Sequence, residues 1–268
     1  MPGYWDLGTS VSFSSPTTTA DELQLPSIVR LGFSGRLSLT NALELSAGVA
    51  LPPKQENITD DPPLFAGSAM ARWAIGRRQS LYVATSANRL LQLAGARDDG
   101  VWGQAALGWD GRSFMDRGRR IAFSWNVGAG TGRAFAAAEA PWLTEAIAGL
   151  GLTGAFLRGN FGFTLGADFR FPIVSGGRAY WAAEMPTINP QTRADLHATA
   201  FVSLATGWNV TASVILADRG HVSAPETILP VLEGGYDQAT FVVSFSYSAI
   251  RKKKTPMVMV GDAGAARR

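Results

Sequence analysis

Cysteine is absent from the 268 residues of this chain, which excludes disulfide bonds and thiolate metal sites. Lysine occurs only at position 54 and in the run 252–254, and charged residues make up 17% of the chain, against about 25% in soluble domains. Apolar residues make up 46% of the chain, yet no apolar run approaches the ~20 residues that a membrane-spanning helix needs. The net charge of +3 is too small to indicate a nucleic-acid partner.

The N-terminus has neither the basic region nor the apolar region of a secretory signal peptide, because Met1 to Trp5 lead directly into a strand pattern. Taken alone, this beginning indicates a cytosolic protein. We expect instead a mature chain to which a start codon has been added, and this expectation depends on the pattern that follows.

Strict alternation of apolar and polar residues runs through the whole sequence, as expected of β-strands. In the segment 29–39, for example, Val29, Leu31 and Phe33 share one face while Arg30 and Ser34 share the other. Each segment has about 10–13 residues, close to the ~9–11 of a tilted transmembrane strand and longer than the usual strand of a soluble protein. About twelve strands are predicted, at residues 4–14, 28–39, 43–52, 64–75, 80–89, 101–110, 120–131, 146–157, 161–173, 194–205, 208–218 and 238–248.

The connections between these segments alternate between short turns and long loops. The long ones, at 15–27, 53–63, 90–100, 132–145, 174–193 and 219–237, contain most of the prolines and many acidic residues. Short turns on one side and long loops on the other are typical of outer-membrane barrels, and an even strand count places both chain ends on the short-turn, periplasmic side.

The apolar face of these strands carries almost no charge, whereas the other face holds Ser, Thr, Asn, Gly and most of the strand Arg and Asp. A soluble surface of that area would carry Lys and Glu. A closed sheet also removes every strand edge, which is obligatory in lipid. The sequence therefore predicts an all-β protein, a closed antiparallel up-and-down transmembrane β-barrel with its apolar face outward.

Aromatic side chains on the predicted outward face gather within a few residues of a short turn or a chain end. A ring at this level is expected where amphipathic aromatics lie at headgroup depth. Strand-forming tendency alone could also place aromatics there. The predicted membrane-interface girdle consists of Trp5, Trp73, Trp109, Phe161, Trp208 and Tyr247.

Residues 4–248 resemble the bacterial outer-membrane β-barrels as a broad class. The last predicted strand, Thr240 to Tyr247, looks like the terminal strand that the barrel-insertion machinery of that class reads. The chain departs from the pattern because some twenty residues follow this aromatic. We expect residues 1–248 to form the barrel, and 249–268 to be a basic, flexible periplasmic tail.

Charged residues on the predicted inner face allow two interpretations. They could form a slightly cationic constriction near the periplasmic end that selects anions, with Arg36, Arg72 and Arg120 as first candidates. They could equally form ion pairs that brace the wall, and both interpretations stay open. The predicted pore-lining residues are Arg30, Arg36, Glu44, Arg72, Arg120, Asp168 and Arg170, beside Asp6, Asp110 and His197.

Outside the strands, the long loops are acidic and the short-turn side is basic, with Arg77, Arg78 and Arg112 among its residues. Acidic pairs such as Asp60 and Asp61 could bind a divalent cation, but solvated charges explain them better, so we predict no metal and no cofactor. The tail residues Arg251, Lys252, Lys253 and Lys254 could contact a periplasmic or envelope protein partner, or could simply be solvated.

Signals for an enzyme are weak. The GxGxxG match at 149–154 lies inside a predicted strand, which is the wrong context for a dinucleotide site. The spacing of His221 and Ser223 is similar to that of outer-membrane phospholipases, but the pair falls in a long loop and no Asn follows it. We therefore predict a non-enzyme in the outer membrane: a passive or weakly selective channel for small solutes or, as the alternative, an anchoring barrel with a plugged lumen. A lipid hydrolase is a remote third reading.

Overall fold

The computed structural model describes residues 4–17, 27–51, 65–89, 101–116, 118, 120–134, 143–156, 160–174, 192–204, 207–218 and 238–249. Twelve strands account for nearly all of these residues. Among them there is no helix long and apolar enough to cross a membrane.

The strands have 9 to 14 residues each. Their bounds are β1 Trp5–Pro16, β2 Ile28–Ser38, β3 Leu43–Leu51, β4 Ala66–Ala74, β5 Gln79–Arg89, β6 Val101–Phe114, β7 Ile121–Ala134, β8 Leu143–Phe156, β9 Phe161–Val174, β10 Arg193–Ser203, β11 Trp208–Asp218 and β12 Gln238–Ser248. All twelve predicted strands are present, and most of their ends agree to within three residues.

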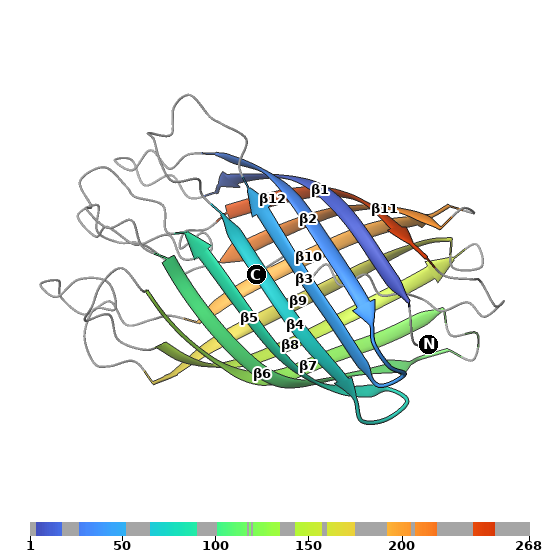
Figure 1. The fold of residues 1–268 in the computed structure, drawn as a ribbon, viewed down its shortest axis with the longest axis horizontal. Coiled ribbons are helices and arrows are strands. Elements are labelled where there is room, and N and C mark those ends of the chain that lie inside the picture. Colours follow the sequence, from blue (N-terminus) through green and yellow to red (C-terminus); the bar gives the residue numbers. More distant parts are fainter. Residues whose placement is uncertain are drawn as a thin grey trace, which may run out of the picture.

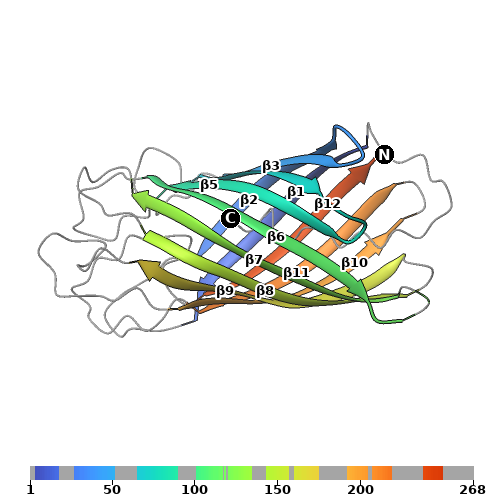
Figure 2. The same ribbon diagram turned by 90° about the horizontal axis from the view of Figure 1, so that it is seen from below.

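The strands form one closed barrel in which each strand pairs antiparallel with its sequence neighbours. The ring closes where β1 pairs with β12, from Asp6 opposite Ser248 to Pro16 opposite Gln238. The strands run obliquely to the long axis of the barrel (Figure 1), and the sheet curves until its first and last strands lie side by side (Figure 2). The predicted closed, antiparallel, up-and-down topology is confirmed.

The apolar face of the sheet is the outer face. In β1, Leu7, Val11 and Phe13 are exposed on the outside, whereas the alternating Ser12 and Ser14 point inward. The same alternation holds around the ring, so large exposed apolar side chains cover the barrel and the inner wall is rich in Ser, Thr and Gly. This arrangement suits lipid outside and a polar interior.

The short turns explain how adjacent strands keep their register. In the turn between β2 and β3, the Thr40 hydroxyl accepts hydrogen bonds from the backbone N–H groups of Ala42 and Leu43, at 3.1 and 2.9 Å. Between β10 and β11, Gly207 has a φ of +92°, a conformation that L side chains rarely adopt. The expected tail from residue 250 onward, with its candidate partner-binding residues 251–254, lies outside the described residues and stays a prediction.

Candidate functional site

The predicted aromatic girdle lies on the outside of the barrel at its short-turn end. The exposed fraction of its six residues ranges from 36% for Tyr247 to 63% for Trp73. Across the β1–β12 junction, the Tyr247 ring lies between Trp5 and Trp208, with centroid distances of 5.9 and 5.2 Å. Sequence reasoning missed Trp125, whose ring packs edge-on against Trp109 at 4.8 Å. Its outward position in β7 could have been read from the alternation of that strand.

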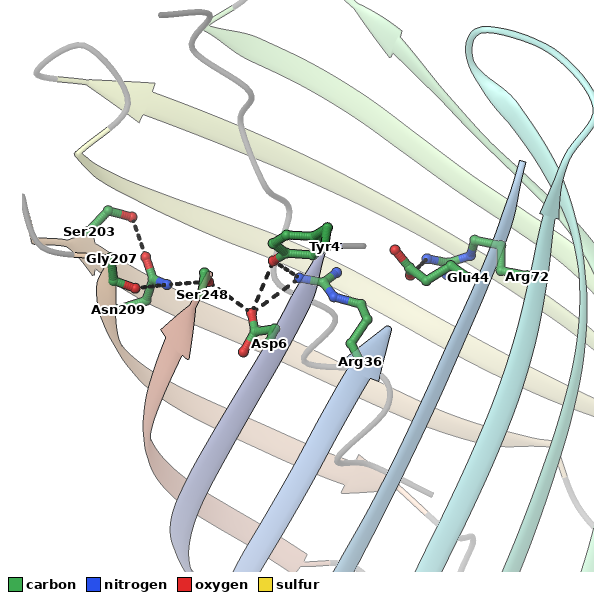
Figure 3. A network of polar contacts seen from close by, with 9 residues as sticks. All are labelled: Tyr4, Asp6, Arg36, Glu44, Arg72, Ser203, Gly207, Asn209 and Ser248. Atoms are coloured by element: carbon green, nitrogen blue, oxygen red, sulfur yellow. Dashed lines mark hydrogen bonds and ion pairs between the residues drawn. The ribbon is translucent and has the colours of Figure 1, made fainter. Parts of the chain in front are cut away.

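A polar network spans the closure of the barrel at the periplasmic end of the inner wall (Figure 3). The Asp6 carboxylate accepts hydrogen bonds from Arg36 at 3.4 Å, Tyr4 at 3.3 Å and Ser248 at 3.1 Å. Asn209 donates to the Ser248 hydroxyl at 3.0 Å and links β11 to this group. One carboxylate therefore ties together β1, β2 and β12.

Tyr4 was not predicted as part of this network, although the first predicted strand began at this residue. Its hydroxyl also accepts a hydrogen bond from Arg36 at 3.1 Å, and the guanidinium carbon lies 5.5 Å from the ring centroid. Burial raises the pKa of the Tyr4 hydroxyl, while the Arg36 charge beside it acts in the opposite direction. The neutral phenol is therefore the form that completes the network.

Arg72 lies between two carboxylates on neighbouring parts of the wall. Its guanidinium is 3.0 Å from Asp110 on β6 and 3.8 Å from Glu44 on β3. Ser80 on β5 donates to the other oxygen of Asp110 at 2.8 Å. Arg72 is thus held by two carboxylates of the described wall, which argues against this residue as the centre of an anion-selecting constriction.

A second, more buried cluster lies toward the long-loop end, on β6 to β10. Glu145 forms ion pairs with Arg193 on β10 and, at 3.7 Å, with Arg170 on β9. Arg170 also reaches Gln104 on β6, donating a hydrogen bond at 2.9 Å. The side chains of Glu145, Arg170 and Arg193 are only 5%, 12% and 12% exposed. This cluster crosses the inner surface of β7 and closes off that part of the wall from water.

The local backbone places Glu145 at an irregular point of the sheet. The β8–β9 register shifts between Thr144 and Glu145, and Glu145 lies opposite Pro172. Proline has no backbone N–H to donate to the ladder, so a bulge is where a strand tolerates it. Glu145 and Arg193 were both missed by sequence reasoning, because the predicted strands began one residue after each of them.

Asp168 and His197 occupy the middle of the inner wall on β9 and β10. Asn126 on β7 donates to the Asp168 carboxylate at 3.2 Å, and His197 Nδ1 lies 3.7 Å from the other carboxylate oxygen. The His197 ring lies over Gly166, where a Cβ atom would clash with it. Glycine at 166 therefore allows the imidazole to lie flat along the wall.

Of two other predicted pore-lining residues, the structure places Arg30 as expected and Arg120 elsewhere. Arg30 lies on the inner face, opposite Ser12. Arg120 lies before β7, in the turn, where its side chain is 73% exposed and pairs with Asp116 at 3.4 Å. Backbone hydrogen bonds from Ile121 and Arg120 hold the pKa of the Asp116 carboxyl below its usual value. Arg120 thus sits at the rim with a counter-charge of its own, and not on the lumen wall.

Within the described ranges, no group of His, Asp or Glu side chains is arranged to hold a metal ion. The acidic loop pair at Asp60 and Asp61 lies outside these ranges. The polar groups described on the inner wall instead form ion pairs and hydrogen bonds with one another.

Comparison with known proteins gives a fold but no family. No protein-family model and no curated protein matches this sequence. The structure is similar to the translocator domain of the autotransporter NalP from Neisseria meningitidis, with a TM-score of 0.54, 15% identity, and coverage of 92% of this chain and 88% of that one. It is also similar to a bacterial polysaccharide outer membrane secretin, with a TM-score of 0.50, 8% identity, and coverage of 91% and 97%.

At these identities the likeness establishes the fold alone. The protein is thus a twelve-stranded barrel of the bacterial outer-membrane class. The apolar belt and aromatic girdle on its outer face are what lipid contact requires, so the bilayer of the outer membrane is its environment.

Proposed function

We propose that this barrel is a channel for the passive diffusion of small polar solutes with weak charge selectivity. The observation that carries the proposal is the solvent exposure of charged side chains on the inner wall. Glu44 and Arg72 are 25% and 26% exposed, and Asp168 is 33% exposed, although all three point away from the lipid face. Water-accessible charges on an inner wall are expected of an aqueous lumen and not of a packed one.

The way in which large inner side chains are accommodated supports the same proposal. Tyr82 lies over Gly108, and Phe201 lies over Gly162, where a Cβ atom would clash with each ring. These rings therefore lie flat against the wall. A twelve-stranded barrel is also wider than the eight-stranded kind that side chains can fill.

The charges of the described inner wall balance, which is why weak selectivity is proposed. Its basic residues and its acidic residues are equal in number, and most have a partner of opposite sign within 4 Å. The basic set is Arg30, Arg36, Arg72, Arg112, Arg170 and Arg193, and the acidic set is Asp6, Glu44, Asp110, Glu145, Asp168 and Asp195.

An anchoring barrel with a plugged lumen is the second candidate. The observation in its favour is the buried Glu145 cluster, which fills part of the interior with side chains. We propose no catalytic role, since the pair that motivated the hydrolase reading, His221 and Ser223, lies outside the described residues.

Single-channel recording in a planar bilayer across a potassium chloride gradient tests the proposal. We expect a stable open current with a reversal potential near zero, and a shift toward cations in Arg72→Glu, because three carboxylates would then share one site. Arg72→Lys, which keeps the charge, is the control and leaves the reversal potential in place. Barrels that insert but never conduct would overturn the channel and favour the plugged alternative.

A further inference from the structure

At the periplasmic mouth of the barrel, the guanidinium groups of two arginines lie against the ring of one phenylalanine. The guanidinium carbons of Arg78 and Arg112 lie 5.8 and 5.5 Å from the centroid of the Phe114 ring. Arg78 belongs to the turn between β4 and β5, and Arg112 and Phe114 belong to the end of β6. The two positive charges therefore come from different parts of the chain, and both contact the Phe114 ring.

A backbone hydrogen bond holds Arg78 and Arg112 opposite each other. The Arg112 N–H donates a hydrogen bond to the Arg78 carbonyl at 2.9 Å, which continues the β5–β6 ladder one step beyond Gln79 opposite Gly111. The two arginines consequently face each other across the ladder, and like charges placed directly opposite are unfavourable. The Phe114 ring and the backbone ladder hold the two guanidinium groups close together despite their like charge.

These side chains face the lumen and not the lipid. Arg112 is two residues from Asp110, whose inward carboxylate holds Arg72 and Ser80, and Phe114 lies opposite the inward, buried Ala122. A guanidinium that lies against an aromatic ring still presents its N–H groups at the edge, in the geometry that suits a carboxylate or phosphate. Two such groups at one mouth suit a small oxyanion better than a single arginine would.

We propose that Arg78, Arg112 and Phe114 form a binding site for a small diffusible oxyanion, such as phosphate, at the periplasmic mouth. The arginines supply the charge-assisted hydrogen bonds, and Phe114 positions them. The site goes beyond the proposed channel function and stands without it, because it needs a folded barrel but no current.

The test is a titration of inorganic phosphate with detergent-refolded full-length protein at low ionic strength, followed by the broadening of the phosphorus-31 resonance. We expect saturable broadening with the natural chain, and at least about tenfold weaker binding in Arg78→Gln and in Arg112→Gln, as for loss of a hydrogen bond to a charged group. Phe114→Leu keeps both charges but removes the ring, so about two- to fivefold weaker binding is expected.

The matched control is Arg120→Gln, which removes an exposed arginine of the next turn that already pairs with Asp116. It should leave the phosphate affinity unchanged. Equal broadening by the natural chain and by the Arg78→Gln/Arg112→Gln double variant would overturn the site, even in barrels that conduct. Binding that depends on these arginines in barrels that do not conduct would support the site while the channel proposal fails.

Discussion

Replacing Glu145 with alanine is expected to destabilise the barrel by about 3–5 kcal/mol, the range measured when one partner of a buried ion pair is removed. The variant leaves Arg170 and Arg193 close together in a part of the wall where their side chains are only 12% exposed. No other residue on β8 supplies the negative charge that this position provides. We expect this to be the most destabilising single substitution on the inner wall.

The measurement is urea-induced unfolding in lipid vesicles, followed by tryptophan fluorescence. Glu44→Ala is the matched control, since its partner Arg72 keeps Asp110 at 3.0 Å and the site is 25% exposed. That control should cost less than about 1 kcal/mol, as for exposed ion pairs. Equal losses in the two variants would mean that the Glu145 cluster is not the buried network described above.

Removal of the Asp6 carboxylate is expected to loosen the junction between the first and last strands. Asp6→Ala deprives Arg36, Tyr4 and Ser248 of their common acceptor, and the expected loss is about 1.5–3 kcal/mol, as for hydrogen bonds to a charged group. Hydrogen exchange of the β1 and β12 amides should rise more than that of β6 and β7, because the lost contacts lie at the closure.

A graded variant separates this effect from a general loss of stability. Tyr4→Phe removes only the hydroxyl that donates to Asp6 and accepts from Arg36, so a loss of about 1 kcal/mol is expected. Uniform acceleration of exchange around the whole barrel in Asp6→Ala would contradict a role confined to the closure.

Most of the fold could be predicted from the sequence, because period-two alternation over ten or more residues fixes both the strand and its outward face. The prediction failed where a glycine hid the pattern. We predicted the end of β6 at residue 110, but the strand continues to Phe114 through Gly111, over which the Trp125 ring lies. A side chain at position 111 would collide with that ring, so this outward position is a glycine and shows no apolar residue in the alternation.

The inner wall was less predictable than the fold. Alternation identifies that Arg36, Glu44 and Arg72 face inward, but it does not say which carboxylate each arginine meets. The contact between Arg170 and Gln104 joins strands three apart in the ring, so it depends on the curvature and stagger of the closed sheet. Those quantities are set by the whole barrel and are not encoded in any one segment.

Because the natural chain has no cysteine, single cysteines can report directly on which face of the sheet is wet. The most direct measurement compares Ser12→Cys with Val11→Cys, adjacent positions in the middle of β1, for reaction with a membrane-impermeant maleimide after reconstitution into vesicles. Ser12 faces the lumen, and Val11 is 49% exposed on the outer face. The account predicts fast labelling at position 12 and protection at position 11. Labelling at position 11 with protection at position 12 would contradict it, because the apolar face would then be the one in water.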